Sequence, residues 1–148
     1  RVRAPRRAGG WAGVVQFAGT LLFNVSTWSA LHPSLSGPQV DHRVWAPDAL
    51  GSVAFLVASG LAFAEVARPG LRWRPQDLGW AVTMFNMVGS IAFGASAVGA
   101  RIVTGTDELR NAQVANVGTL VGAICFLVGA VLLVPEELGA QPGRGPDR

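Results

Sequence analysis

Four apolar stretches, each about long enough to cross a membrane, most constrain what this chain can fold into. They cover residues 11–31, 48–67, 78–100 and 113–134. An α-helix rises about 1.5 Å per residue, so about 20 residues span the roughly 30 Å of a bilayer's hydrocarbon core. We therefore predict an all-α, integral membrane four-helix bundle whose transmembrane domain covers residues 11–134.

Charged residues are missing from the interior of these stretches. The charge-free intervals run from Arg7 to Asp41, from Asp77 to Arg101 and from Arg110 to Glu136. The interval between Asp48 and Glu65 is shorter, so the second stretch is the weakest of the four predicted spans. A soluble four-helix bundle would carry a charged face on each helix, and the sequence provides none.

The composition agrees with a lipid environment. Only 14% of the residues are charged, against about 25% in an ordinary soluble domain. The single cysteine, Cys125, excludes an intramolecular disulfide and a multi-cysteine metal site. All twelve basic residues are Arg, which together with abundant Ala, Gly and Val is typical of a GC-rich bacterial genome. Because the chain starts at Arg1 and not at Met, we expect it to be a fragment or a trimmed product.

The arginines predict the orientation in the membrane. Nine of them fall in the N-terminal tail, the second connector and the C-terminal tail, whereas the other side has three, Arg43, Arg101 and Arg110. The positive-inside rule then places both termini in the cytoplasm of a bacterium, with the chain in the inner (plasma) membrane. Residues 1–10 would form a basic tail and residues 135–148 a flexible one. A cleaved signal peptide is the alternative for the first stretch, but its apolar run is too long and no clear cleavage site follows.

Two halves of the chain resemble each other. The segments QFAGTLLFNVST (residues 16–27) and NMVGSIAFGASA (residues 86–97) align at an offset of 70. In the other two stretches, LGSV matches VGTL at an offset of 67 and FLVASG matches FLVGAV at an offset of 71, which an insertion of four residues would reconcile. We predict two parallel copies of a helical hairpin, related by an axis along the membrane normal.

Small residues recur in every stretch, in the phrases GTLLF, GSVAF, GSIAF and GTLVG. In lipid the hydrophobic effect does not press helices together, so close packing depends on small residues, and Ser or Thr can hydrogen-bond across the contact. The predicted helix-packing residues are Gly19, Gly51, Gly89, Gly118 and Gly122.

Weakly polar residues lie at helical spacing in the same stretches. We call this set the polar seam; it consists of Gln16, Thr20, Asn24, Asn86, Ser90, Asn116 and Thr119. Residues three or four apart share one helical face, so the seams can meet inside a bundle. The structural interpretation is hydrogen bonding between helices, and the functional alternative is a water-filled or ligand-binding polar path.

The stretches VWAPDALGSVAFLVASGLAF and NMVGSIAFGASAVGA, with Trp at the helix ends, resemble the YrhK-like membrane domain. These are bacterial multi-pass membrane proteins of unknown function, built on a Gly-rich helix pair. The resemblance covers about half of the chain. It implies a multi-pass membrane protein and carries no functional residue with it.

Residues that could perform chemistry are few, and no ionisable residue lies at the centre of a stretch. Glu65 is expected at the headgroups facing Arg68, with a role in ion coupling as the alternative. His32 and His42, beside Asp41, could form a loose metal site in a connector, and Cys125 is expected to pack in the membrane. We predict no catalytic residue, no metal and no cofactor. The expected partners are the lipid bilayer and either a second copy or another membrane protein, with no nucleic acid.

The sequence therefore predicts a multi-pass inner-membrane protein that is not an enzyme and acts through helix packing or a partner. The alternative is a small transporter or channel that uses the polar seam.

Overall fold

The computed structural model describes residues 6–32, 34–66, 77–103, 105–106 and 108–139. Its helices are α1 (Arg6–Ala30), α2 (Gly37–Val40), a π-helical turn η1 (Asp41–Trp45), α3 (Ala46–Val66), α4 (Leu78–Gly99) and α5 (Ala112–Gly139). Within these residues no strand forms, and one isolated antiparallel bridge joins Ile102 to Leu109. The all-α prediction is confirmed.

Among the residues that the structure describes, three helical segments are long and apolar enough to cross a membrane: Gly37–Val66, Leu78–Gly99 and Ala112–Val134. The second predicted span, which the sequence ranks weakest, is therefore among them. α1 is 25 residues long but is not among the three. Its sequence contains Gln16 and Asn24, two polar amides that lower the hydropathy of an otherwise apolar helix.

The second helix begins earlier than the sequence predicts. Residues 37–47 precede the predicted start at Asp48, but they continue α3 toward its N-terminus through α2 and η1. The helix starts where Gln39 accepts a hydrogen bond from the backbone N–H of Ser36 at 3.0 Å, with Pro38 in the first turn, where its missing N–H costs nothing. Pro47 follows the wider π turn, in which the N–H of Ala46 bonds to the carbonyl of Asp41. Such a turn gives room for a proline ring inside a helix.

The other helix ends differ by smaller amounts. α1 begins at Arg6, within the segment expected to be a basic tail. α5 ends at Gly139, so helix continues into the segment expected to be a flexible tail. The predicted connector over 67–76, with its three arginines, and residues 140–148 lie outside the described residues.

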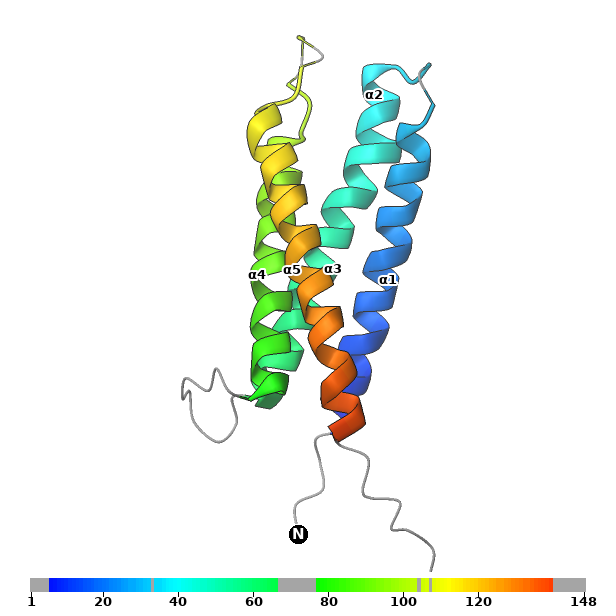
Figure 1. Cartoon of the computed structure of the whole chain (residues 1–148). Helices are drawn as coiled ribbons and strands as arrows, with labels where there is room; N and C mark the ends of the chain where they lie inside the picture. The colour runs from blue at the N-terminus through cyan, green and yellow to red at the C-terminus, as the bar shows by residue number, and fades with distance from the viewer. Residues whose placement is uncertain (1–5, 33, 67–76, 104, 107, 140–148) are drawn as a thin grey trace, which may run out of the picture.

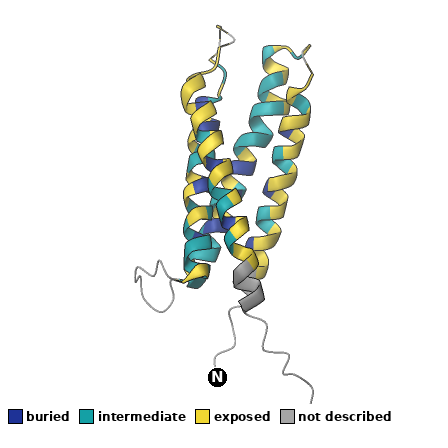
Figure 2. Ribbon diagram, viewed as in Figure 1, coloured by how far each residue is buried: buried dark blue, intermediate teal, exposed yellow. Residues whose placement is uncertain are grey.

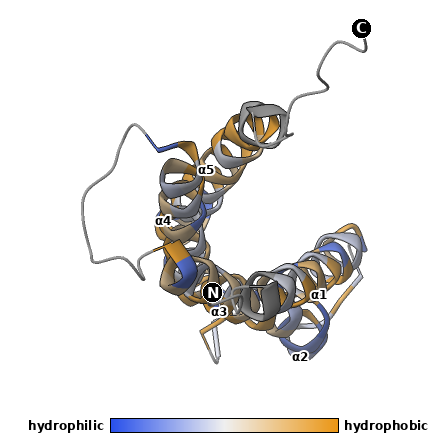
Figure 3. Cartoon of the chain, turned by 90° about the horizontal axis from the view of Figure 1, so that it is seen from below, coloured by the Kyte–Doolittle hydropathy of each residue, from blue (hydrophilic) through white to orange (hydrophobic). Residues whose placement is uncertain are grey.

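The four long helices form one curved row in the order α1, α3, α4, α5 (Figure 3). Neighbours in the chain are neighbours in space: α1 packs on α3, α3 on α4 and α4 on α5. α1 and α5 stand at the two ends of the row, so the helices do not close into a ring. The α1–α2 and α4–α5 connections lie at one end of the molecule, and the start of α1 and the end of α5 lie at the other (Figure 1). The sequence predicts a four-helix bundle, and the structure arranges the four long helices as an open, curved row.

The pattern of burial is the reverse of that in a soluble protein (Figure 2). Apart from Phe55, the buried side chains are small or weakly polar: Ala12, Ser26, Ser52, Ala58, Ser59, Thr83, Ser90, Ser96, Ala97 and Ala115. Large apolar side chains face outward, with Trp28 69% exposed and Leu127 64% exposed. Small residues between helices and large apolar residues outside suit a protein surrounded by lipid.

Candidate functional site

Each long helix carries a glycine followed four residues later by a phenylalanine. The pairs are Gly19–Phe23 in α1, Gly51–Phe55 in α3, Gly89–Phe93 in α4 and Gly122–Phe126 in α5. The four rings meet in one cluster, with centroids 5.1 Å apart for Phe23–Phe55, 5.0 Å for Phe23–Phe93 and 4.9 Å for Phe55–Phe126. One aromatic ring from every helix therefore joins the centre of the row.

The rings also interlock with the glycines, and they do so reciprocally. The Phe55 ring lies 2.9 Å from where a Cβ on Gly19 would stand, and the Phe23 ring lies 2.9 Å from the same point on Gly51. Both contacts recur between α4 and α5. The Phe126 ring is 3.0 Å from a Cβ on Gly89, and the Phe93 ring is 2.9 Å from a Cβ on Gly122.

A serine completes each of these two helix pairs. Ser26 of α1 donates to the carbonyl of Val44 at 2.8 Å, and Ser96 of α4 donates to the carbonyl of Ala115 at 2.7 Å. Ser26 and Ser96 are 70 residues apart, and Val44 and Ala115 are 71 apart. The same offsets relate the glycines and phenylalanines of the two pairs, so these Phe–Gly and Ser–carbonyl contacts occur at equivalent positions in both pairs.

All five predicted packing glycines lie against a neighbouring helix, but one plays a different part from that expected. The sequence pairs Gly118 with Gly51, whereas the structure places Gly122 in the equivalent contact. An offset of 71 suffices for both halves of the segment, and no insertion is needed. Gly118 instead lets α5 approach the backbone of α4, because a Cβ there would stand 2.7 Å from the carbonyl oxygen of Ala92.

The contact between α3 and α4 is held by serines. Ser90 is fully buried, and its Oγ lies 2.8 Å from Ser59 Oγ, 3.1 Å from the carbonyl of Phe55 and 2.8 Å from that of Asn86. Ser59 also reaches the Asn86 carbonyl at 3.2 Å, and Ser52 donates to the Phe93 carbonyl at 3.2 Å. Two members of the polar seam, Asn86 and Ser90, are therefore engaged between these helices.

The remaining members of the polar seam lie at the ends of the row. Thr119 of α5 bonds to Ser96 Oγ at 2.7 Å and to the Ala115 carbonyl at 2.9 Å. Thr20 of α1 is exposed and donates to the carbonyl of half-buried Gln16 at 3.1 Å, within its own helix. Asn24 and Asn116 are both exposed. The structure thus does not bring the seams of α1 and α5 together.

Trp45 of η1 hydrogen-bonds to the C-terminal part of α4. Its Nε1 donates to the carbonyl of Ala97 at 2.8 Å, and the guanidinium carbon of Arg101 lies 5.6 Å from the ring centroid. This distance allows a cation–π contact. The sequence suggests only that Trp45 marks a helix end, and its hydrogen bond joins residues 52 apart.

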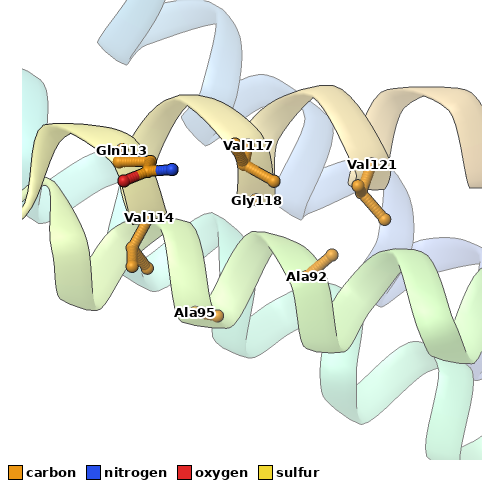
Figure 4. Close-up of a pocket in the computed structure, with 7 residues that line it drawn as sticks. All are labelled: Ala92, Ala95, Gln113, Val114, Val117, Gly118 and Val121. Atoms are coloured by element: carbon orange, nitrogen blue, oxygen red, sulfur yellow. The ribbon is translucent and has the colours of Figure 1, made fainter.

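Two shallow grooves run between neighbouring helices. One lies between α4 and α5 and is lined by Ala92, Ala95, Gln113, Val114, Val117, Gly118 and Val121 (Figure 4). The other lies between α3 and α4, with Trp45, Val53, Leu56 and Ile91 among its lining residues. Their walls are almost entirely apolar, which suits a lipid chain and not an ion or a polar solute.

The candidates for chemistry stay apart. His32 and His42 are exposed, and His32 Nδ1 contacts the carbonyl of Trp28 at 3.3 Å. In the part of the chain that the structure describes, no three His, Cys, Asp or Glu side chains gather as a metal site would require. Cys125 is half-buried beside Gly89. Glu65 is half-buried near the end of α3, and its expected partner Arg68 is outside the described residues.

Sequence reasoning missed the phenylalanines, although a signal for them exists. The Gly-x-x-x-Phe spacing is present in all four stretches, but the fourth copy is GAICF (residues 122–126) and not GTLVG (residues 118–122). The carbonyl partners of Ser26, Ser90 and Ser96 leave no signal, because a backbone acceptor can belong to any residue type.

Comparison with protein-family models, with curated proteins and with solved structures finds no match to this chain.

Proposed function

We propose that this chain is a bacterial inner-membrane protein with four spans that acts by packing in the membrane with itself or a partner, without catalysing a reaction. α1 is the fourth span. Its 25 residues extend about 37 Å, enough to cross a bilayer, and it lies alongside the more apolar helices (Figure 1). With four spans both termini lie on one side, which the arginines place in the cytoplasm.

The two helix pairs are proposed to be repeats of one hairpin. The support is the match of contacts: two Phe–Gly contacts and one Ser–carbonyl hydrogen bond in each pair, at offsets of 70 and 71 residues. Each hairpin crosses twice, so both copies have the same orientation, as in parallel repeats. The resemblance to the YrhK-like domain supports a multi-pass protein and adds no activity.

The main support for a packing function is that a polar face of α1 is exposed. Thr20, Asn24 and Thr27 are all exposed, within a helix whose other exposed residues include Phe17 and Leu21. An amide in hydrocarbon without a hydrogen-bond partner costs several kcal/mol, roughly. A membrane protein therefore covers such a face with another helix, whereas the described contacts of α1 with α3, with η1 and, through Phe23, with Phe93 of α4 leave these three side chains exposed.

The transporter or channel alternative would need a continuous polar path along Gln16, Asn24, Asn86 and Asn116. Asn86 is the α4 member of that set: its backbone carbonyl accepts from Ser59 of α3, and its side-chain oxygen lies 2.7 Å from the Cβ position of Gly129 in α5, away from the α1 members. The two grooves between helices are apolar. This arrangement favours packing over transport.

Purification of the tagged full chain from its own membranes in a mild detergent tests the proposal. The chain should run as a stoichiometric assembly, either with itself or with one membrane protein. Thr20→Leu should break the assembly, because a larger side chain would prevent close approach to α1. Val25→Leu, on the lipid-facing side of the same helix, is the matched control and should leave it intact. A wild-type chain that is monomeric and alone in its own membranes would overturn the packing function.

A further inference from the structure

We propose that the exposed polar face of α1 is covered by α5 of a second copy, through the same contact that joins α3 to α4 within one chain. This inference rests on the proposed function and identifies its partner. Two copies would stand with their curved rows face to face, each α5 against the other's α1. The result is a closed, two-fold ring of eight long helices.

The first step is the equivalence of α1 and α4. At an offset of 70, Thr20 corresponds to Ser90 and Gln16 to Asn86. The equivalence extends to local bonding, since Thr20 donates to the Gln16 carbonyl at 3.1 Å as Ser90 does to the Asn86 carbonyl at 2.8 Å. In α4 this face is buried against α3, and Ser90 is 0% exposed. In α1 the same face is open.

The second step is the equivalence of α3 and α5. At an offset of 71, the residues with which α3 meets α4, namely Ser52, Leu56 and Ser59, correspond to Ala123, Leu127 and Ala130 of α5. The three α5 residues are all exposed, and Leu127 is 64% exposed. Ala is no larger than Ser, so this face of α5 permits the close approach that the α3 face has.

In the middle of the row, a face of α3 packs on a face of α4. Each end helix exposes a face equivalent to one of these two. The exposed face of α1 is equivalent to the α4 face, and the exposed face of α5 is equivalent to the α3 face. The partner that fits both is a second copy of this chain. A contact between unlike faces closes into a ring when the rotation between copies allows it. The curvature in Figure 3 leaves both end helices beside the same open side.

The proposed contact supplies a second acceptor for Thr20, which already donates to the Gln16 carbonyl. Ser90 reaches the carbonyl of Phe55, so Thr20 would reach the carbonyl of Phe126 in the second copy. Asn116, the exposed counterpart of Trp45, would lie on the side of α5 that faces Thr27 of the second copy. Asn24 corresponds to Gly94, whose Cβ position is 3.5 Å from Leu56, so its side chain would lie beside Leu127 of the second copy, which offers it no hydrogen bond.

Disulfide cross-linking in native membranes tests the proposed contact. Ser59 Oγ and Ser90 Oγ are 2.8 Å apart, so their counterparts Ala130 and Thr20 should be within disulfide reach between copies. In a Cys125→Ser background, one copy carries T20C and a differently tagged copy carries A130C. Oxidation should yield a covalent pair with both tags. The matched control replaces T20C with V25C, which faces lipid, and should give at least about tenfold less product.

The outcomes distinguish the proposed α1–α5 contact from other ways of covering α1. A T20C–A130C pair, together with a purified assembly of twice the chain mass, supports the proposal. A T20C copy that cross-links only to T20C would show α1 packing on α1 and would overturn it. A chain that is monomeric when purified also overturns it. If no pair forms but Thr20→Leu still disrupts a complex with a different protein, this inference fails while the proposed packing function survives.

Discussion

The ring of Phe23 lies 2.9 Å from the point where a Cβ on Gly51 would stand, and the ring of Phe55 stands in the same relation to Gly19. Each helix of the α1·α3 pair thus provides both the ring and the space for its partner's ring. Because lipid tails are as apolar as the rings, burial alone does not drive this pairing, and the gain comes from close van der Waals contact. The fit depends on the absence of one methyl group on each side.

Gly51→Ala should therefore destabilise the protein. The added methyl group meets the Phe23 ring at 2.9 Å and the backbone oxygen of Gly19 at 3.1 Å, and such overpacking costs about 1–3 kcal/mol. Gly60→Ala in the same helix is the control, since nothing lies within 4 Å of its Cβ position. It should be neutral or stabilising by up to about 1 kcal/mol, because Ala favours a helix over Gly. Unfolding free energies in detergent measure both, and equal values would contradict the interlocked contact.

Gly118→Ala should be more damaging than Gly51→Ala. The new methyl group would stand 2.7 Å from the carbonyl oxygen of Ala92, and backbone cannot rotate away as a phenylalanine ring can. We expect a loss at the upper end of the overpacking range, about 3 kcal/mol. The measurement is the same unfolding free energy. A loss smaller than that of Gly51→Ala would mean that α5 does not lie directly on the α4 backbone.

The buried serines of α3 and α4 should be energetically coupled. Ser59 Oγ and Ser90 Oγ are 2.8 Å apart and share the Asn86 carbonyl. A double-mutant cycle with Ser59→Ala and Ser90→Ala should give a coupling of about 0.6 kcal/mol, and no more than about 1.7, as for hydrogen bonds in other membrane proteins. Each single variant also loses a hydrogen bond to a backbone carbonyl, and the cycle subtracts this loss because it compares the double variant with both single variants. Strict additivity would show that the two hydroxyl groups do not bond.

The sequence predicts the helix class because charge-free runs of this length have few other structures. It also predicts that glycines lie between helices, but three members of the polar seam, Thr20, Asn24 and Asn116, are exposed. The sequence does not predict features that depend on how the helices are arranged in space. Whether the row closes is set by the angle between the α3 and α5 faces of α4, which no local pattern encodes. The helical start at Gly37 depends on the Gln39 cap and on the π turn before Pro47, which a count of prolines treats as a loop.

Trp45 should stabilise the chain through its N–H group as well as its ring. Trp45→Phe keeps an aromatic ring near Arg101 but loses the 2.8 Å hydrogen bond to the Ala97 carbonyl. The expected loss in unfolding free energy is about 0.5–1.5 kcal/mol. Trp28→Phe is the control, because Trp28 is 69% exposed, and it should change stability by less than about 0.5 kcal/mol. Similar losses in both variants would argue against a specific role for the Trp45 N–H.

The number of spans decides where the loops lie. Ser34 and Thr106 are exposed and belong to the two connections at the same end of the molecule (Figure 1). In a Cys125→Ser background, Ser34→Cys and Thr106→Cys should both react in intact cells with a maleimide that cannot cross the inner membrane. Tags on the two chain ends should react only after that membrane is opened, because the arginine distribution predicts that both ends lie in the cytoplasm. Had α1 stayed on one surface while three helices crossed, the N-terminal tag and the C-terminal tag would report opposite sides.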